Sequence, residues 1–159
     1  MQFGQEIGDR GYKIQSVSMI YSKEISGGYK EEDRYTLLSG DSISYIEILN
    51  GFKFTISPFA FFQVNTNVFE KMLNEIQDFL NIDSNTILFD VCCGTGAIGI
   101  CLSRKAKKVL GFELVDAAVK NARENVDLNK EEIEQDKCEF FSGRAEYLLP
   151  EVAKKYSDS

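Results

Sequence analysis

The sequence predicts an α/β fold, a doubly wound parallel sheet preceded by a small β-rich segment. From residue 67 onward, helical periodicity alternates with short apolar runs, which is the pattern of βαβ units in a parallel sheet. Before that point the chain reads as short alternating strands separated by Gly and Asn turns. We therefore expect a boundary near 57–66, with 1–56 as the β-rich segment and 57–159 as the α/β part.

The β-rich segment is expected to end in a hairpin. Asn50-Gly51 lies between two alternating runs, and this dipeptide is a strong signal for a tight turn between antiparallel strands. Gly27-Gly28 marks an earlier turn. The expected strands are 14–21, 35–38, 43–49 and 52–56.

The α/β part is expected to begin with a helix over 67–80. Asn67 followed by Glu70 fits a capping box at its start. Asp116 is expected to cap a later helix that ends near Leu128. The remaining expected elements are strands at 86–91, 108–113 and 138–141 and a helix over 97–104.

Composition limits the classes of function. The 159 residues carry a net charge of −7, which argues against this chain alone gripping a phosphate backbone. Its basic cluster, Arg104 to Lys108, is expected to be a solvated helix end favoured by the macrodipole. No apolar run reaches the ~20 residues of a membrane span, and the first residues lack a signal-peptide pattern. We therefore expect no membrane partner.

The cysteines point to a reduced protein without a metal site. Cys92, Cys93, Cys101 and Cys138 have no CxxC spacing, and the chain has no histidine. Adjacent Cys92 and Cys93 are poorly placed to bridge each other, so all four are expected to pack as small hydrophobes. The expected location is intracellular, in the cytosol or nucleus, with the mitochondrion also possible.

A glycine loop predicts a nucleotide-containing cofactor. Gly94-Thr95-Gly96-Ala97-Ile98-Gly99 fits GxGxxG between a predicted strand and a predicted helix. This is the dinucleotide fingerprint, so an NAD-binding Rossmann domain is one hypothesis. Glu113 ends the next strand, where an acid holds ribose hydroxyls in either NAD or an adenosine-containing methyl donor. The glycines and Glu113 therefore leave the cofactor open.

Asp90 favours the methyl donor. It lies four residues before Gly94, at the carboxyl end of a strand, where we expect it to face the ligand crevice. A pyrophosphate there would meet a carboxylate, and like charges ~4 Å apart cost several kcal/mol at an effective dielectric near 20. S-adenosylmethionine instead carries an ammonium and a sulfonium, which a carboxylate attracts. The sign of the charge therefore favours S-adenosylmethionine over NAD.

One stretch is far more specific. Residues 54–66 read FTISPFAFFQVNT, which resembles the S-P-x-x-F-x-Q-x-N entry motif of the RNA 5-methyluridine methyltransferases. Blocks at 89–96, 109–113 and 143–146 agree with the same family, and VCCGTG is most similar to its eukaryotic members, the tRNA (uracil-5-)-methyltransferase homologs. The resemblance covers about 35–150. It implies that the α/β part is the N-terminal half of a Rossmann-like S-adenosylmethionine methyltransferase domain.

The resemblance also implies roles for single residues. Gln63 matches a glutamine at the donor site, Glu113 matches the acid on the adenosine ribose, and Cys92 occupies a cofactor-lining position. Ala97 falls where bacterial members often have Asn, so a side-chain hydrogen bond from that position is lost here. The expected cofactor-binding residues are Gln63, Asp90, Cys92, Gly94, Gly96 and Glu113.

The implied reaction is methylation of uracil C5 in RNA, with tRNA as the expected substrate. In the family a cysteine thiolate adds to C6 and makes C5 nucleophilic. The family's Ser-Cys-Asn-Pro-like and Asp-Pro-Pro-Arg-like motifs do not occur here, so we expect a chain truncated after its third strand of the sheet. Catalytic residues and most of the RNA-binding surface are then expected outside it. Two alternatives stay open: a non-catalytic or differently targeted S-adenosylmethionine-binding fragment, and the NAD-binding domain.

Overall fold

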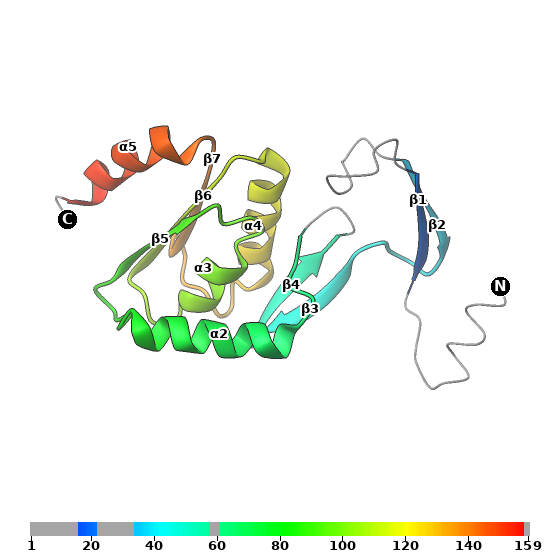
Figure 1. The fold of residues 1–159 in the computed structure, drawn as a ribbon, viewed down its shortest axis with the longest axis horizontal. Coiled ribbons are helices and arrows are strands. Elements are labelled where there is room, and N and C mark those ends of the chain that lie inside the picture. Colours follow the sequence, from blue (N-terminus) through cyan, green and yellow to red (C-terminus); the bar gives the residue numbers. More distant parts are fainter. Residues whose placement is uncertain (1–15, 22–33, 58–60, 158–159) are drawn as a thin grey trace. The chain divides into compact units, whose positions relative to one another are not determined.

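The computed structural model describes residues 16–21, 34–57 and 61–157, and its elements are drawn in Figure 1. The predicted turn at Gly27-Gly28 lies outside these residues, as do Pro58 to Ala60 of the entry motif.

The contacts divide the chain into two compact units. Unit 1 comprises Met1–Tyr45 and Ile56–Phe59, and unit 2 comprises Ile46–Thr55 and Ala60–Ser159. The hairpin that we assigned to the β-rich segment therefore belongs, by its contacts, to the unit that holds the glycine loop.

In unit 1, two of the predicted strands form an antiparallel pair. β1 (Val17–Tyr21) pairs with β2 (Arg34–Ser39), and Met19 lies opposite Thr36. The register shifts between Val17 and Ser18, where an extra residue on one strand interrupts the ladder.

The hairpin of unit 2 forms as its turn predicts. β3 (Tyr45–Leu49) and β4 (Phe52–Ile56) are joined by Asn50 and Gly51, with φ angles of 49° and 78°. Positive φ at both central residues is the requirement of a type I′ turn, which only residues such as Asn and Gly meet at low cost.

The central feature of unit 2 is a parallel three-stranded sheet in the order β5-β6-β7. Its strands are β5 (Ile87–Val91), β6 (Lys108–Glu113) and β7 (Cys138–Ser142). β6 lies in the middle, so its side chains are covered on both faces, and Phe112 is fully buried. The sheet and its helices confirm the predicted α/β class.

Helices cover both faces of this sheet (Figure 1). α3 (Ala97–Leu102) and α4 (Asp116–Leu128) pack on one face, and α2 (Thr66–Phe79) packs on α3. α5 (Ala145–Ser157) packs against β6, where Tyr156 donates a hydrogen bond of 3.1 Å to Glu139. The sequence analysis did not predict α5.

The start of α2 differs from the predicted capping box. Asn65, not Asn67, is the N-cap, and its side chain accepts a hydrogen bond of 3.1 Å from the Val68 amide. Glu70 does not close a capping box. It accepts a hydrogen bond of 2.7 Å from the Asn50 amide, so α2 and the hairpin turn are joined by a charge-assisted bond.

Two apolar layers hold the sheet. On the side of α2 and α3, Ile82, Leu102, Ala106 and Val109 form a buried cluster. The second layer is a row of stacked aromatic rings in which Phe112 lies 5.9 Å from Phe89 and 5.4 Å from Phe141, centroid to centroid. Burial of each such side chain contributes ~1.5–3 kcal/mol, so the carboxyl ends of the strands are fixed firmly.

Candidate functional site

The glycine loop follows β5 after Cys92 and Cys93, and its first two glycines serve different purposes. Gly94 has φ 56°, and a Cβ built there would meet nothing within 4 Å. Gly96 has φ 80°, and its Cβ would lie 2.8 Å from Cζ of Phe140. Gly96 therefore allows the loop to pack onto β7, whereas Gly94 leaves its backbone open to a ligand.

The adjacent cysteines are in opposite environments. Cys92 is exposed with φ 61°, so the expected packing role is wrong for this residue. Its exposure beside the loop is compatible with its predicted cofactor-lining role. Cys93 is buried, and its amide donates a hydrogen bond of 3.1 Å to the Phe112 carbonyl.

The remaining thiols are protonated at neutral pH. Burial raises the pKa of Cys93 to about 12, and the nearby negative charges of Asp90 and Glu113 add to the rise. Burial also raises the pKa of Cys101 to about 12 and that of Cys138 to about 11. Because the thiolate is the nucleophile, these three cysteines pack as expected and are poor candidates for covalent catalysis.

Asp90 is buried beneath the glycine loop, with 8% of its surface exposed. Its Oδ2 atom accepts a hydrogen bond of 2.9 Å from the Gly99 amide, in the first turn of α3. Burial raises the pKa of Asp90 to about 6, against the lowering effect of the Gly99 bond, and the Glu113 charge raises it further. The carboxylate is thus ionised at neutral pH but poorly solvated.

Glu113 holds the loop from the end of β6. Its Oε2 atom accepts a hydrogen bond of 3.0 Å from the Gly94 amide, and its Oε1 atom accepts bonds of 2.8 and 3.0 Å from the Leu114 and Val115 amides. Val115 is the N-cap of α4, so the prediction that Asp116 caps this helix is wrong. A carboxylate has about four acceptor positions, so roughly one stays open to a ligand.

Gln63 precedes α2 and is exposed. Among the described residues it makes no hydrogen bond to the glycine loop, but its neighbour Phe62 lies 5.9 Å from the Phe54 ring of β4. The structure therefore brings Asp90, Gly94 and Glu113 together, and the roles of all six predicted residues stay predictions.

Two buried amides were missed by the sequence analysis. Asn125 of α4 and Asn129, the C-cap residue that follows α4, are 1% and 4% exposed. Asn125 donates a hydrogen bond of 3.1 Å to the Thr95 carbonyl in the glycine loop. A signal was present, because both residues lie on the same helical face as the apolar Ala122, where a polar side chain needs a buried partner.

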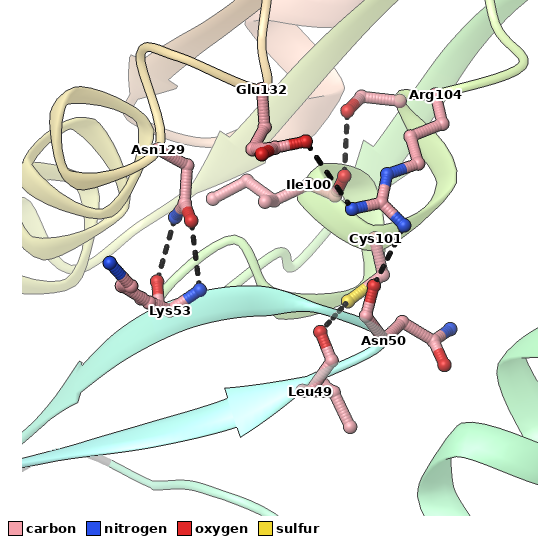
Figure 2. A network of polar contacts seen from close by, with 9 residues as sticks. Leu49, Asn50, Lys53, Ile100, Cys101, Arg104, Asn129 and Glu132 are labelled. Carbon is pink, nitrogen blue, oxygen red and sulfur yellow. Dashed lines mark hydrogen bonds and ion pairs between the residues drawn. The ribbon is translucent and has the colours of Figure 1, made fainter.

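Arg104 and Asn129, which follow α3 and α4, bind the hairpin within unit 2 (Figure 2). Arg104 donates a hydrogen bond of 3.1 Å to the Asn50 carbonyl, lies 3.7 Å from the Glu132 carboxylate and stands 4.3 Å from the Phe52 ring centroid. The expectation that Arg104 is only a solvated helix end is therefore wrong.

Within the described part of the chain, no group of three or more His, Cys, Asp or Glu side chains could hold a metal ion. No helix there is long and apolar enough to cross a membrane.

Comparison with solved structures supports the fold. The crystal structure of Pyrococcus abyssi tRNA (uracil-54, C5)-methyltransferase in complex with S-adenosyl-L-homocysteine aligns with a TM-score of 0.63 at 21% identity, over 86% of this chain and 32% of that one. At this identity the match shows the fold alone, and it confirms the predicted Rossmann-like methyltransferase architecture.

Comparison with curated proteins goes further. The zebrafish (Danio rerio) tRNA (uracil-5-)-methyltransferase homolog B is 43% identical over 77% of this chain. The human homolog A is 44% identical over 74% of it. The chain spans only 24% and 18% of the lengths of these proteins. The family model for tRNA (uracil-5-)-methyltransferase matches residues 47–138. More than half of the chain thus matches, and it belongs to the tRNA (uracil-5-)-methyltransferase family.

Proposed function

We propose that this chain supplies part of the S-adenosylmethionine site of an enzyme that methylates C5 of uracil in RNA, with tRNA as its substrate. The observation that carries the choice of cofactor is the bond between Asp90 and the Gly99 amide. In dinucleotide-binding folds, the amides at the start of the helix after the glycine loop receive the pyrophosphate. Here the Asp90 carboxylate already accepts a hydrogen bond from one of these amides, that of Gly99, so this amide is not free to bind a pyrophosphate.

Charge supports the same choice. Asp90 and Glu113 stand at the carboxyl ends of neighbouring strands, and the charge of Glu113 is one cause of the raised Asp90 pKa. A pyrophosphate beside this pair would be repelled by both carboxylates, which would weaken the binding of a dinucleotide. A cation would relieve the repulsion. The pair therefore favours a ligand with a sulfonium and an ammonium over NAD.

The chain's own residues fit such a ligand. The open space at Gly94 admits an approach to the loop backbone, and the free acceptor position of Glu113 suits a ribose hydroxyl. We propose that Gln63 binds the methionine moiety through its amide and that Cys92 lines the site. When bound, S-adenosylmethionine supplies an electrophilic methyl group.

We propose that the covalent step uses a cysteine outside this chain, because the family's Ser-Cys-Asn-Pro-like motif does not occur here and Cys92 is assigned to the cofactor site. The three thiols with raised pKa values are protonated at neutral pH, and a protonated thiol does not add to uracil C6. We also propose that the RNA is bound largely by other regions, since a net charge of −7 disfavours contact with phosphates. The relatives' names, which specify tRNA (uracil-5-)-methyltransferases, support the substrate class.

Equilibrium dialysis of the full-length protein against S-adenosyl-L-homocysteine and NAD tests the cofactor. We expect the former to bind and NAD not to bind, and preferential NAD binding would overturn the proposal. Transfer of tritiated methyl groups to tRNA tests the reaction. Incorporation that depends on Cys92 or Cys93 would contradict the placement of the nucleophile.

We also propose an intracellular location, in the cytosol, nucleus or mitochondrion. Its support is that all four cysteines are free, as in a reducing compartment. Microscopy of the fluorescently tagged protein tests this, and recovery of the protein only from the secreted fraction would contradict it.

A further inference from the structure

The Asn125 side chain joins two parts of the chain that are far apart in sequence. Its Nδ2 atom donates a hydrogen bond of 3.1 Å to the Thr95 carbonyl of the glycine loop. Its Oδ1 atom accepts a hydrogen bond of 3.0 Å from the Thr55 amide of β4. The residue is 1% exposed, so no water competes for either bond.

This position requires an amide. One end of the side chain must accept a hydrogen bond from an N–H group, and the other must donate one to a carbonyl. Asp can accept but, when ionised, cannot donate, and Leu can do neither. A buried amide that satisfies a donor and an acceptor at once also fixes their separation, because an unpaired buried group is costly.

Both joined segments lead to predicted cofactor residues. On the loop side, Thr95 follows Gly94, whose amide is held by Glu113. On the strand side, Thr55 follows Phe54, whose ring lies 5.9 Å from that of Phe62, next to Gln63. The Asn125 amide therefore stands between the loop and the strand that packs against the Gln63 segment.

We propose that Asn125 is a positioning residue of the cofactor site, which holds the glycine loop at a fixed distance from β4. This inference rests on the proposed function, because its effect on affinity requires that the loop bind the cofactor. Asn125 itself is too deeply buried to contact a ligand. Its role is to keep the loop backbone in the conformation that the cofactor meets.

Asn129 provides a matched control. It is the C-cap residue that follows α4, four residues beyond Asn125. It is also buried and binds the same strand through the Lys53 amide at 2.8 Å and the Lys53 carbonyl at 2.7 Å. Its Nδ2 atom also donates to the Asn125 carbonyl at 2.7 Å. Asn129 thus binds β4 as Asn125 does, but among the described residues it makes no hydrogen bond to the glycine loop.

The test compares Asn125→Asp with Asn129→Asp in the full-length protein. Both substitutions place a carboxylate at a buried site against the same strand, but only Asn125→Asp sets an acceptor against the Thr95 carbonyl. S-adenosyl-L-homocysteine affinity is measured by calorimetry at a temperature where melting curves show both variants folded. We expect roughly tenfold or greater weakening for Asn125→Asp and less than about twofold for Asn129→Asp. Asn125→Ala, which has no donor and adds no charge, is measured beside Asn125→Asp, because burial favours the protonated carboxyl, which can donate to the Thr95 carbonyl. It also replaces Asn125→Asp if that variant does not fold.

A second readout needs no ligand. Amide hydrogen exchange of peptides spanning 92–99 should be roughly tenfold faster in Asn125→Asp than in Asn129→Asp, because only the former releases the loop. Unchanged exchange in this segment, or equal loss of affinity in both variants, would overturn the positioning role. If the two variants show the exchange difference but the wild-type protein binds no S-adenosyl-L-homocysteine, the proposed function is overturned and the contact between Asn125 and the loop still stands.

Discussion

Asp90 has a cost to stability that follows from its burial. Its pKa rises from 3.8 to about 6 in the folded protein. Between these values the folded state binds more protons than the unfolded state, so this group's contribution to stability falls as pH rises and is fully lost above about 6. At neutral pH the free energy of unfolding is therefore about 3 kcal/mol lower than it would be if the pKa of Asp90 were not raised.

Asp90→Asn should therefore stabilise the protein at neutral pH. The amide oxygen can still accept from the Gly99 amide, and the buried charge is gone. We expect a gain approaching 3 kcal/mol at pH 7.5, which shrinks through pH 6 and vanishes near pH 4, measured by urea denaturation of both proteins. A gain that does not change with pH would show that Asp90 does not titrate as its burial implies. Cofactor affinity should fall at the same time, since the substitution removes the charge proposed to attract the cation.

Glu113→Ala is expected to weaken cofactor binding. A charge-assisted bond to a ribose hydroxyl is worth ~1.5–3 kcal/mol, which corresponds to roughly 10- to 150-fold in affinity. The substitution also releases the Gly94 amide, so part of the loss reflects a looser loop. Calorimetric titration with S-adenosyl-L-homocysteine measures the effect. Glu113→Gln, which keeps one acceptor oxygen, should lose less, and an unchanged affinity in Glu113→Ala would reduce Glu113 to a structural strand end.

At the scale of elements, the contribution of Arg104 to holding the hairpin can be tested by one substitution. Arg104→Ala removes the hydrogen bond to the Asn50 carbonyl and the contact with the Phe52 ring. Each is worth ~0.5–1.5 kcal/mol, so we expect a loss of about 1–2 kcal/mol in the free energy of unfolding, measured by chemical denaturation. Lys105→Ala, an exposed neighbour, is the control and should change stability by less than about 0.5 kcal/mol. Equal effects of the two substitutions would mean that Arg104 is solvated after all.

Elements could be predicted where the residues of a short segment determine the structure, but the N-caps of the helices could not. The Asn50-Gly51 turn forms because positive φ is needed at both positions. The N-cap of α2 is Asn65, whose side chain accepts from the Val68 amide, and Glu70 instead accepts from the Asn50 amide of the hairpin turn. α5 was missed although its residues form a regular helix around Pro150. The contact of Glu70 is tertiary and so is not visible in a local pattern, and Pro150 is a residue that local patterns associate with the end of a helix.

At the scale of the molecule, the parallel sheet and its glycine loop could be predicted from periodicity and spacing. The hydrogen bonds within the site could not. The motif located Asp90, Gly94 and Glu113, because parallel strands bring their carboxyl ends to one edge. It did not reveal that Asp90 is bonded to Gly99 or that Glu113 is bonded to Gly94. Asn125 escaped because its partners lie 30 and 70 residues away, and no local pattern encodes such separations.

These separations also set an order of events during synthesis. The outer edge of β4 finds its partners in Asn125 and Asn129, which follow Thr55 and Lys53 by 70 and 76 residues. At a ribosomal rate of about 5–20 residues per second, the strand waits about 4–15 s for them. During that time the Lys53 and Thr55 amides are an open edge, the kind of surface that recruits other strands. The newly made hairpin therefore passes through an interval in which it is sensitive to aggregation, and α4 ends that interval when it emerges.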